Sequence, residues 1–207
     1  MVNIINSTLP VRMQILEKKS YNRYIMLLNT KKIETKSMIE LEVGEEYLAE
    51  VYEDKGVISF KNLLKKPKIR LFEEGAELIE KLLQEGDEKA WYKKFLIQRL
   101  MESKSAYEFE IYKEMFFAFF EGIYHIPFVY EGNRALFEAK KNGNILEVYL
   151  YFEIFGALKI IIDNGKIARI QTPFAKVAHF LNEYFKFEVV NTLNPMFVFK
   201  RLIDIKG

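Results

Sequence analysis

The sequence has no cysteine among its 207 residues. This absence excludes disulfide bonds, thiolate nucleophiles and thiolate-bound metal sites at once, and it fits a cytosolic protein. Hydrophobic residues, by contrast, make up 50% of the chain, with 18 Phe and 12 Tyr among them. The chain can therefore build a sizeable core that is rich in aromatic side chains.

Long apolar runs are also missing. No stretch reaches the roughly 18 apolar residues of a membrane-spanning helix, and the densest stretch, residues 115–123, is interrupted by Glu121 and Gly122. The first ten residues have no basic region and only a short apolar run, so we expect no signal peptide. We therefore expect a cytoplasmic protein without membrane insertion.

Neither sign of charge predominates, because 31 Lys and Arg face 29 Asp and Glu, for a net charge of +2. A nucleic-acid-binding protein needs a basic excess to release counterions from phosphates, so we do not expect a nucleic-acid partner. One basic cluster covers residues 65–70, with Phe60 and Phe72 on either side. With a small barrel beside it, this cluster suits an oligonucleotide-binding module; the other interpretation is a solvated linker.

Signatures of catalysis are absent as well. The two histidines, His125 and His179, have no partner nearby in the sequence with which to bind a metal ion or exchange protons. Paired carboxylates such as Glu45 and Glu46 stand among polar residues, which favours solvated charge over acid–base chemistry. No phosphate-binding loop, nucleophile elbow, zinc-protease or EF-hand pattern is present. We expect no enzymatic activity, no cofactor and no metal ion.

The N-terminal third alternates between short apolar runs and turn residues. This pattern predicts five strands, at residues 11–17, 21–28, 31–37, 47–52 and 57–60. A turn at residues 53–56, which contains Asp54 and Gly56, is a strong hairpin signal between the last two strands. We therefore predict a small β-barrel-like domain over residues 1–66, with a boundary at Pro67.

From residue 72 the apolar residues recur at spacings of three and four, which predicts three helices. Ser105 followed by Glu108 is a capping-box pattern at the start of the third helix. These helices form a predicted connector over residues 67–122.

After Gly122 the apolar period changes to two. Strands are predicted at residues 126–130, 135–140, 146–153, 157–162 and 166–171. Thr172 and Pro173 precede a predicted helix over residues 174–185, and two further strands, 187–190 and 196–202, end the chain. The third predicted domain, residues 123–207, is thus a mixed β-sheet packed with one helix, and the whole chain belongs to the α+β class.

Tyr149 and Tyr151 lie on the strand face opposite Leu146, Val148 and Leu150. Tyrosines that point outward from a strand offer a partner a large contact area at little cost in entropy. The other interpretation is that the protein's own helices cover this face.

Residues 145–160, with the sequence Ile-Leu-Glu-Val-Tyr-Leu-Tyr-Phe-Glu-Ile-Phe-Gly-Ala-Leu-Lys-Ile, resemble the C-terminal domain of flagellar hook-length control proteins. That family has a strand, a Leu-Gly step and a second strand of alternating apolar residues. Here Phe155 and Gly156 take the place of the Leu-Gly step, and Ala157 and Leu158 begin the second strand. The hairpin, helix and closing strand that follow are in the family's order. Residues 24–28 and 41–51 are similar to a small β region of its short members.

Two features differ from the family. No proline precedes the Phe155-Gly156 step, and the chain has no long N-terminal half rich in Pro and Gln. In the family, that half measures the length of the hook.

The resemblance implies a non-enzymatic, protein-binding role in flagellar assembly, in hook-length control and the switch of export specificity. The implied partner is the cytoplasmic domain of the export gate of the flagellar type III apparatus. The contact segment carried over is Phe155, Gly156, Ala157 and Leu158, in which Gly156 is required for a positive φ or a close approach. The implied location is the cytoplasm, or export through the flagellar apparatus. This role predicts an exposed apolar patch near Gly156 or on the Tyr149 and Tyr151 face.

Overall fold

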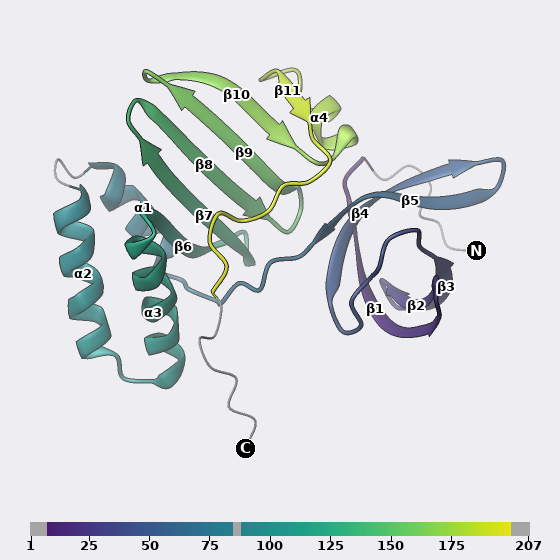
Figure 1. Ribbon diagram of the computed structural model, residues 1–207, viewed down its shortest axis with the longest axis horizontal. Helices are drawn as coiled ribbons and strands as arrows, with labels where there is room; N and C mark the ends of the chain where they lie inside the picture. Colours follow the sequence, from purple (N-terminus) through teal and green to yellow (C-terminus); the bar gives the residue numbers. More distant parts are fainter. Residues whose placement is uncertain (1–7, 85–87, 200–207) are drawn as a thin grey trace. The chain divides into compact units, whose positions relative to one another are not determined.

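The computed structural model describes residues 8–84 and 88–199. Four helices and eleven strands lie in this part of the chain, and the strands form two sheets (Figure 1). The predicted α+β class is therefore confirmed.

The chain groups into two compact units, each made of separate segments. The first unit contains the chain up to Lys68 together with Ile154–Leu158 and Arg169–Leu193. The second contains Ile69–Glu153, Lys159–Ala168 and the chain from Asn194 onward. We expected three consecutive domains, whereas these units combine segments that are far apart in the sequence.

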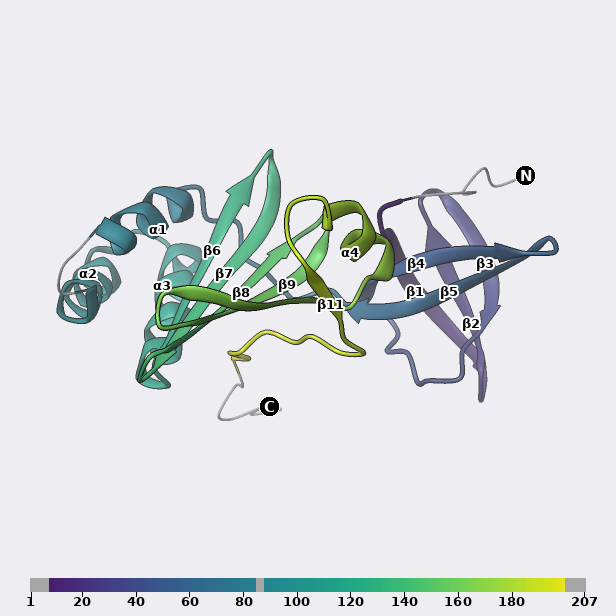
Figure 2. The ribbon, with the colours of Figure 1, turned by 90° about the horizontal axis from the view of Figure 1, so that it is seen from above.

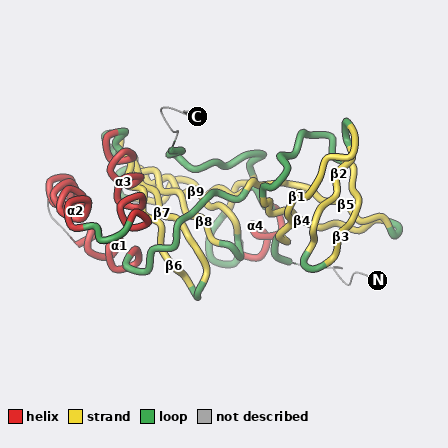
Figure 3. The backbone as a smooth tube through the Cα atoms, turned by 90° about the horizontal axis from the view of Figure 1, so that it is seen from below, coloured by secondary structure: helices red, strands yellow, loops and turns green. Residues whose placement is uncertain are grey.

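The five N-terminal strands are β1 (Val11–Ser20), β2 (Arg23–Leu28), β3 (Lys31–Lys36), β4 (Glu46–Asp54) and β5 (Val57–Lys65). All five were predicted, but β1 and β5 run past their predicted ends at residues 17 and 60. They form an antiparallel sheet in the order β3-β2-β1-β4-β5. Figure 3 shows these strands in yellow. Its core includes Ile15, Tyr24 and Met26. Within the described residues β3 and β5 are the two free edges of the sheet, so a closed barrel is not confirmed.

Three helices follow, as predicted: α1 (Gly75–Gln84), α2 (Glu88–Glu102) and α3 (Ala106–Phe120). The Ser105 side chain accepts a hydrogen bond from the Glu108 main-chain nitrogen at 3.1 Å, so the predicted cap of α3 is confirmed. Gly75 allows α1 to approach the neighbouring strand, because a Cβ atom there would lie 2.1 Å from the Pro127 carbonyl oxygen.

The second sheet begins with β6 (Ile123–Tyr130), β7 (Asn133–Asn142) and β8 (Ile145–Phe152). It continues through β9 (Gly156–Asp163), β10 (Lys166–Thr172), helix α4 (Ala175–Leu181) and β11 (Phe187–Val189). The strand order is β11-β10-β9-β8-β7-β6, and β11 runs parallel to β10. One face of β6, β7 and β8 packs against α1, α2 and α3 through a core that includes Tyr92, Tyr112 and Ile126. The predicted mixed sheet is confirmed, but α1, α2 and α3 pack against it in addition to the predicted helix α4.

Two predictions at the end of the chain are wrong. The predicted strand over residues 196–202 is not a strand in its described part, residues 196–199. The reason is that the main-chain nitrogens of Met196 and Phe197 donate to the side chain of Glu138 rather than to a neighbouring strand. The helix predicted over residues 174–185 is also too long: α4 begins at Ala175 and ends at Leu181.

Candidate protein-interaction surface

Tyr149 and Tyr151 are completely buried. Tyr149 lies directly opposite Glu138 of β7, on the sheet face that the C-terminal segment, residues 194–199, crosses (Figure 1). Burial raises the pKa of Tyr149 far above its ordinary range, and the Glu138 carboxylate raises it further. The expectation that these tyrosines point outward to a partner is therefore not met, because this face is covered by the chain itself.

Glu138 fastens the C-terminal segment to the sheet. Its side chain is buried and accepts hydrogen bonds from the Met196 nitrogen at 2.5 Å and the Phe197 nitrogen at 3.3 Å. The Nδ1 atom of His125 lies 2.7 Å from the same carboxylate, and the His125 ring packs edge-on against Phe197 at 5.3 Å. His125 thus has a structural partner that lies 13 residues away in the sequence.

The segment that the resemblance singles out is largely interior. Gly156 has a φ of +75°, and a Cβ atom there would lie 2.3 Å from the ring of Phe174. Both reasons for glycine at this position, a positive φ and a close approach, are thus present. Ala157 is fully buried, while Phe155 and Leu158 are partly exposed. The segment supports the residues that precede α4 and offers little surface of its own.

An exposed apolar surface does lie on α4 and the chain that follows it. It is formed by Phe180, Tyr184, Phe185 and Val189, which are 50%, 73%, 52% and 49% exposed. The nitrogens of Tyr184 and Phe185 both donate to the Leu181 carbonyl, so the aromatic residues share the end of the helix and the turn after it. Because α4 packs against β11 (Figure 2), Val189 belongs to the same region. We call these four residues the α4–β11 surface.

The α4–β11 surface is held in place by a buried carboxylate of the N-terminal sheet. Glu50 of β4 is fully buried, and it accepts a hydrogen bond from the main-chain nitrogen of Lys176, in the first turn of α4, at 2.5 Å. The Tyr52 hydroxyl and the Asn62 amide also donate to Glu50, at 2.8 and 2.7 Å. The Lys176 ammonium group donates to the Val51 carbonyl at 2.6 Å. The helix is thus fixed at its N-terminal end by a residue that no local sequence signal identifies.

Thr172, the residue expected to cap α4, does not bind an N–H group of the helix itself. Its hydroxyl accepts a hydrogen bond from the Phe174 nitrogen at 3.3 Å, one residue before the helix begins. Glu50 therefore accepts the hydrogen bond of the Lys176 N–H group in the first turn, a group that the side chain of a local cap would otherwise bind.

The basic cluster at residues 65–70 is neutralised by carboxylates. The side-chain nitrogen of each basic residue lies close to a glutamate carboxylate oxygen. The N–O distances are 2.6 Å for Lys65 and Glu42, and 3.3 Å for Lys66 and Glu46. They are 2.8 Å for Lys68 and Glu45, and 3.1 Å for Arg70 and Glu114. A cation that already has a carboxylate partner has less to gain from binding a phosphate. Carboxylates thus surround the basic cluster and offset its positive charge.

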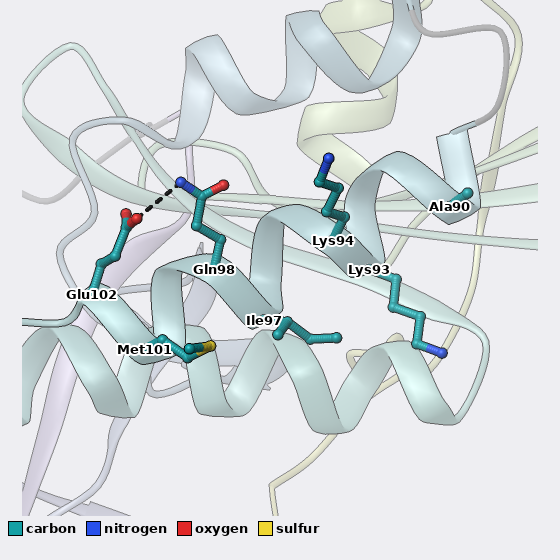
Figure 4. Close-up of a pocket in the computed structure, with 7 residues that line it drawn as sticks. All are labelled: Ala90, Lys93, Lys94, Ile97, Gln98, Met101 and Glu102. Carbon is teal, nitrogen blue, oxygen red and sulfur yellow. Dashed lines mark hydrogen bonds between the residues drawn. The ribbon is translucent and has the colours of Figure 1, made fainter.

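A shallow hollow of about 480 Å³ lies along one side of α2 (Figure 4). Ile97 and Met101 form its apolar part, Lys93 and Lys94 flank it, and Gln98 donates to Glu102 at 2.9 Å. All the residues that line it belong to one helix. The hollow is thus an open helix surface and not an enclosed site where catalytic groups converge.

Two features are absent from the described part of the chain. Within it, no helix is both long enough and apolar enough to cross a membrane. Over the same residues, no group of three or more His, Asp or Glu side chains is placed to hold a metal ion.

No protein-family model, no curated protein and no solved structure matches this chain.

Proposed function

We propose that this chain is a non-enzymatic binding protein of flagellar assembly that docks on the cytoplasmic domain of the type III export gate. In this role it acts in hook-length control and in the switch of export specificity, either in the cytoplasm or after export through the flagellar apparatus. The partner and the process rest on the resemblance of residues 145–160 to the hook-length control family.

The observation that carries the binding role is the exposure of three aromatic side chains, Phe180, Tyr184 and Phe185, on one short segment. Aromatic residues are enriched among the residues that dominate binding at protein interfaces. Clustered apolar exposure of this kind is typical of an interaction site. The segment also lies in the region that follows the hook-length control family's order of elements.

The fixed position of α4 supports the same role. Because Glu50 and Val51 hold Lys176 at both its main-chain nitrogen and its side chain, the helix is ordered before a partner arrives. A preformed surface loses less conformational entropy on binding than a flexible one.

The alternative function, an oligonucleotide-binding module of the N-terminal sheet and the basic cluster, receives less support. Lys65, Lys66 and Lys68 each have a glutamate partner in the same unit. We therefore expect only weak affinity for single-stranded DNA, measured by fluorescence anisotropy at low salt.

The test is a titration of the full chain with the purified cytoplasmic domain of the export gate from the same organism, by isothermal calorimetry. Tyr184→Ala removes the most exposed side chain of the α4–β11 surface and should weaken binding at least about tenfold. Tyr21→Ala is the matched control, since Tyr21 is 94% exposed but lies in the turn between β1 and β2. No binding by the wild type, or equal losses in both variants, would contradict the proposal.

A further inference from the structure

Strand β11 ends the second sheet and leaves one of its edges open. The register pairs Ile170 with Phe187 and Thr172 with Val189, and the Val190 nitrogen donates to the Thr172 carbonyl at 3.0 Å. Successive residues of a strand turn their main-chain groups to opposite sides. Since Val190 faces β10, Glu188 does so too, whereas Phe187 and Val189 direct their N–H and C=O groups to the outer edge. No strand of the described chain lies beyond that edge.

The other three sheet edges of the described chain carry features that discourage pairing. Edge strand β3 contains Lys31, Lys32 and Lys36. Edge strand β5 is interrupted at Asn62, which has a φ of 54°. Edge strand β6 contains Pro127, which has no N–H group, and α1 packs against it. Lysine, proline, irregular backbone, a very short strand and a covering helix are devices that natural sheets use to blunt an edge.

β11 has no lysine, proline or irregular backbone in its own residues, Phe187, Glu188 and Val189, and it is three residues long. The one charged side chain of the strand is already engaged, because Glu188 accepts from Gln171 at 3.0 Å and lies 3.3 Å from Arg169. Phe187 is partly exposed, and Val189 is about half exposed. The edge is thus short and mostly apolar, with α4 packed against its strand and Lys186 exposed beside it.

We infer that β11 is a strand-addition site, at which an extended segment of the partner protein pairs with the main-chain groups of Phe187 and Val189. A row of main-chain donors and acceptors is complementary to an extended strand rather than to a helix. The exposed apolar neighbours select a segment with alternating apolar side chains. Lys186, exposed at the start of the edge, favours an acidic residue in that segment. This inference rests on the proposed function, since it names how the partner engages the α4–β11 surface.

Proline at position 189 tests the inference. Val189→Pro deletes an N–H group that points outward, so it removes a hydrogen bond to the partner without removing one to β10. Val189→Ala keeps the N–H group and shortens the side chain. With the export-gate domain as the probe, Val189→Pro should weaken binding at least tenfold and Val189→Ala no more than about threefold. Unchanged thermal unfolding of both variants would show that the fold is kept.

Hydrogen exchange of single amides gives a second readout that needs no substitution. On binding, the amides of Phe187 and Val189 should gain protection, while that of Glu188 should change little because it already faces β10. Slower exchange confined to the Tyr184 region, with Phe187 and Val189 unchanged, would overturn strand addition even if Val189→Pro failed to fold.

The outcomes separate the two proposals. If Tyr184→Ala weakens binding and Val189→Pro does not, the surface is correct and strand addition is wrong. If the wild type does not bind the gate domain, both are wrong. If instead the wild-type chain dimerises in sedimentation and Val189→Pro does not, the edge pairs with a second copy, and the inference of a partner segment is overturned.

Discussion

Glu50 and Lys176 are 126 positions apart in the sequence, yet the Glu50 carboxylate accepts a hydrogen bond from the Lys176 main-chain nitrogen. This bond joins the N-terminal sheet to α4 within one compact unit. The carboxylate is fully buried, so each of its hydrogen-bond donors would be left without an acceptor if it were removed.

Glu50→Ala should therefore lower the free energy of unfolding by about 2–4 kcal/mol, measured by urea denaturation. Glu53→Ala is the matched control, because Glu53 is exposed on the same strand and should change stability by less than about 0.5 kcal/mol. Equal effects of the two substitutions would show that the buried carboxylate has no special role.

Releasing the C-terminal segment should expose the buried tyrosines. Glu138→Ala removes the acceptor for Met196 and Phe197, so we expect a loss of about 2–4 kcal/mol and faster hydrogen exchange at these two amides. Glu147→Ala, which removes a partly exposed ion pair with Lys159 on the neighbouring strand, should cost less than about 1 kcal/mol. If the exchange rates of Met196 and Phe197 are the same in Glu138→Ala as in the wild type, Glu138 does not hold the segment.

Removing the hydroxyl group of Tyr149 and that of Tyr52 should change the stability of the fold in different ways. The Tyr149 hydroxyl is buried and has no hydrogen-bond partner among the described residues, so Tyr149→Phe should be neutral or stabilise the fold by up to about 1 kcal/mol. The Tyr52 hydroxyl donates to the Glu50 carboxylate, so Tyr52→Phe should destabilise by about 1–2 kcal/mol. Urea denaturation at pH 7 measures both, and a destabilising Tyr149→Phe would contradict the assignment.

Stability should fall at high pH, and Tyr52 should contribute to the fall. Burial and the nearby Glu50 carboxylate together raise the pKa of Tyr52 to about 12, whereas an unfolded tyrosine titrates near 10. The stabilisation is complete below pH 10 and is lost as pH rises from about 10 to about 12, because the unfolded chain releases its proton first. The gap in unfolding free energy between wild type and Tyr52→Phe should therefore narrow over this window. A gap that stays constant would show that the pKa of Tyr52 is not raised.

Gly156 and Gly165 separate backbone strain from steric contact. Both have a φ near +75°, but only Gly156 has a ring where its Cβ atom would lie. Gly165→Ala should cost about 1 kcal/mol from backbone conformation alone. Gly156→Ala should cost about 2–4 kcal/mol, since Phe174 must also move. Equal melting temperatures for the two variants would show that the Phe174 ring moves aside without a loss of stability.

The elements that were predicted correctly depend on neighbours in the sequence. Ser105 and Glu108 mark the start of α3 because a cap acts over three residues. The Lys55-Gly56 turn has a positive φ at both residues, as a two-residue hairpin requires. These helix caps and turns are determined by a few consecutive residues, so they can be predicted from the sequence.

The features that were missed depend on distant contacts. Alternation correctly places Tyr149 and Tyr151 on the face opposite Val148, but it does not tell what covers that face. The covering segment follows 47 residues after Tyr149, at Met196, and it is placed by distant contacts with Glu138 and His125. The predicted helix to residue 185 would have buried Phe185; because α4 ends at Leu181, Phe185 is exposed and becomes part of the candidate surface.

The interleaved units have a consequence for folding during synthesis. Ribosomes add about 5–20 residues per second, so Lys176 is made about 6–25 s after Glu50. Until then the Glu50 carboxylate has no helix to bind, and the first unit remains incomplete although strands β1 to β5 have already been made. Strand β11 follows later still. The open sheet edge therefore appears only after β10 and α4, the two elements that lie against β11, have been synthesised.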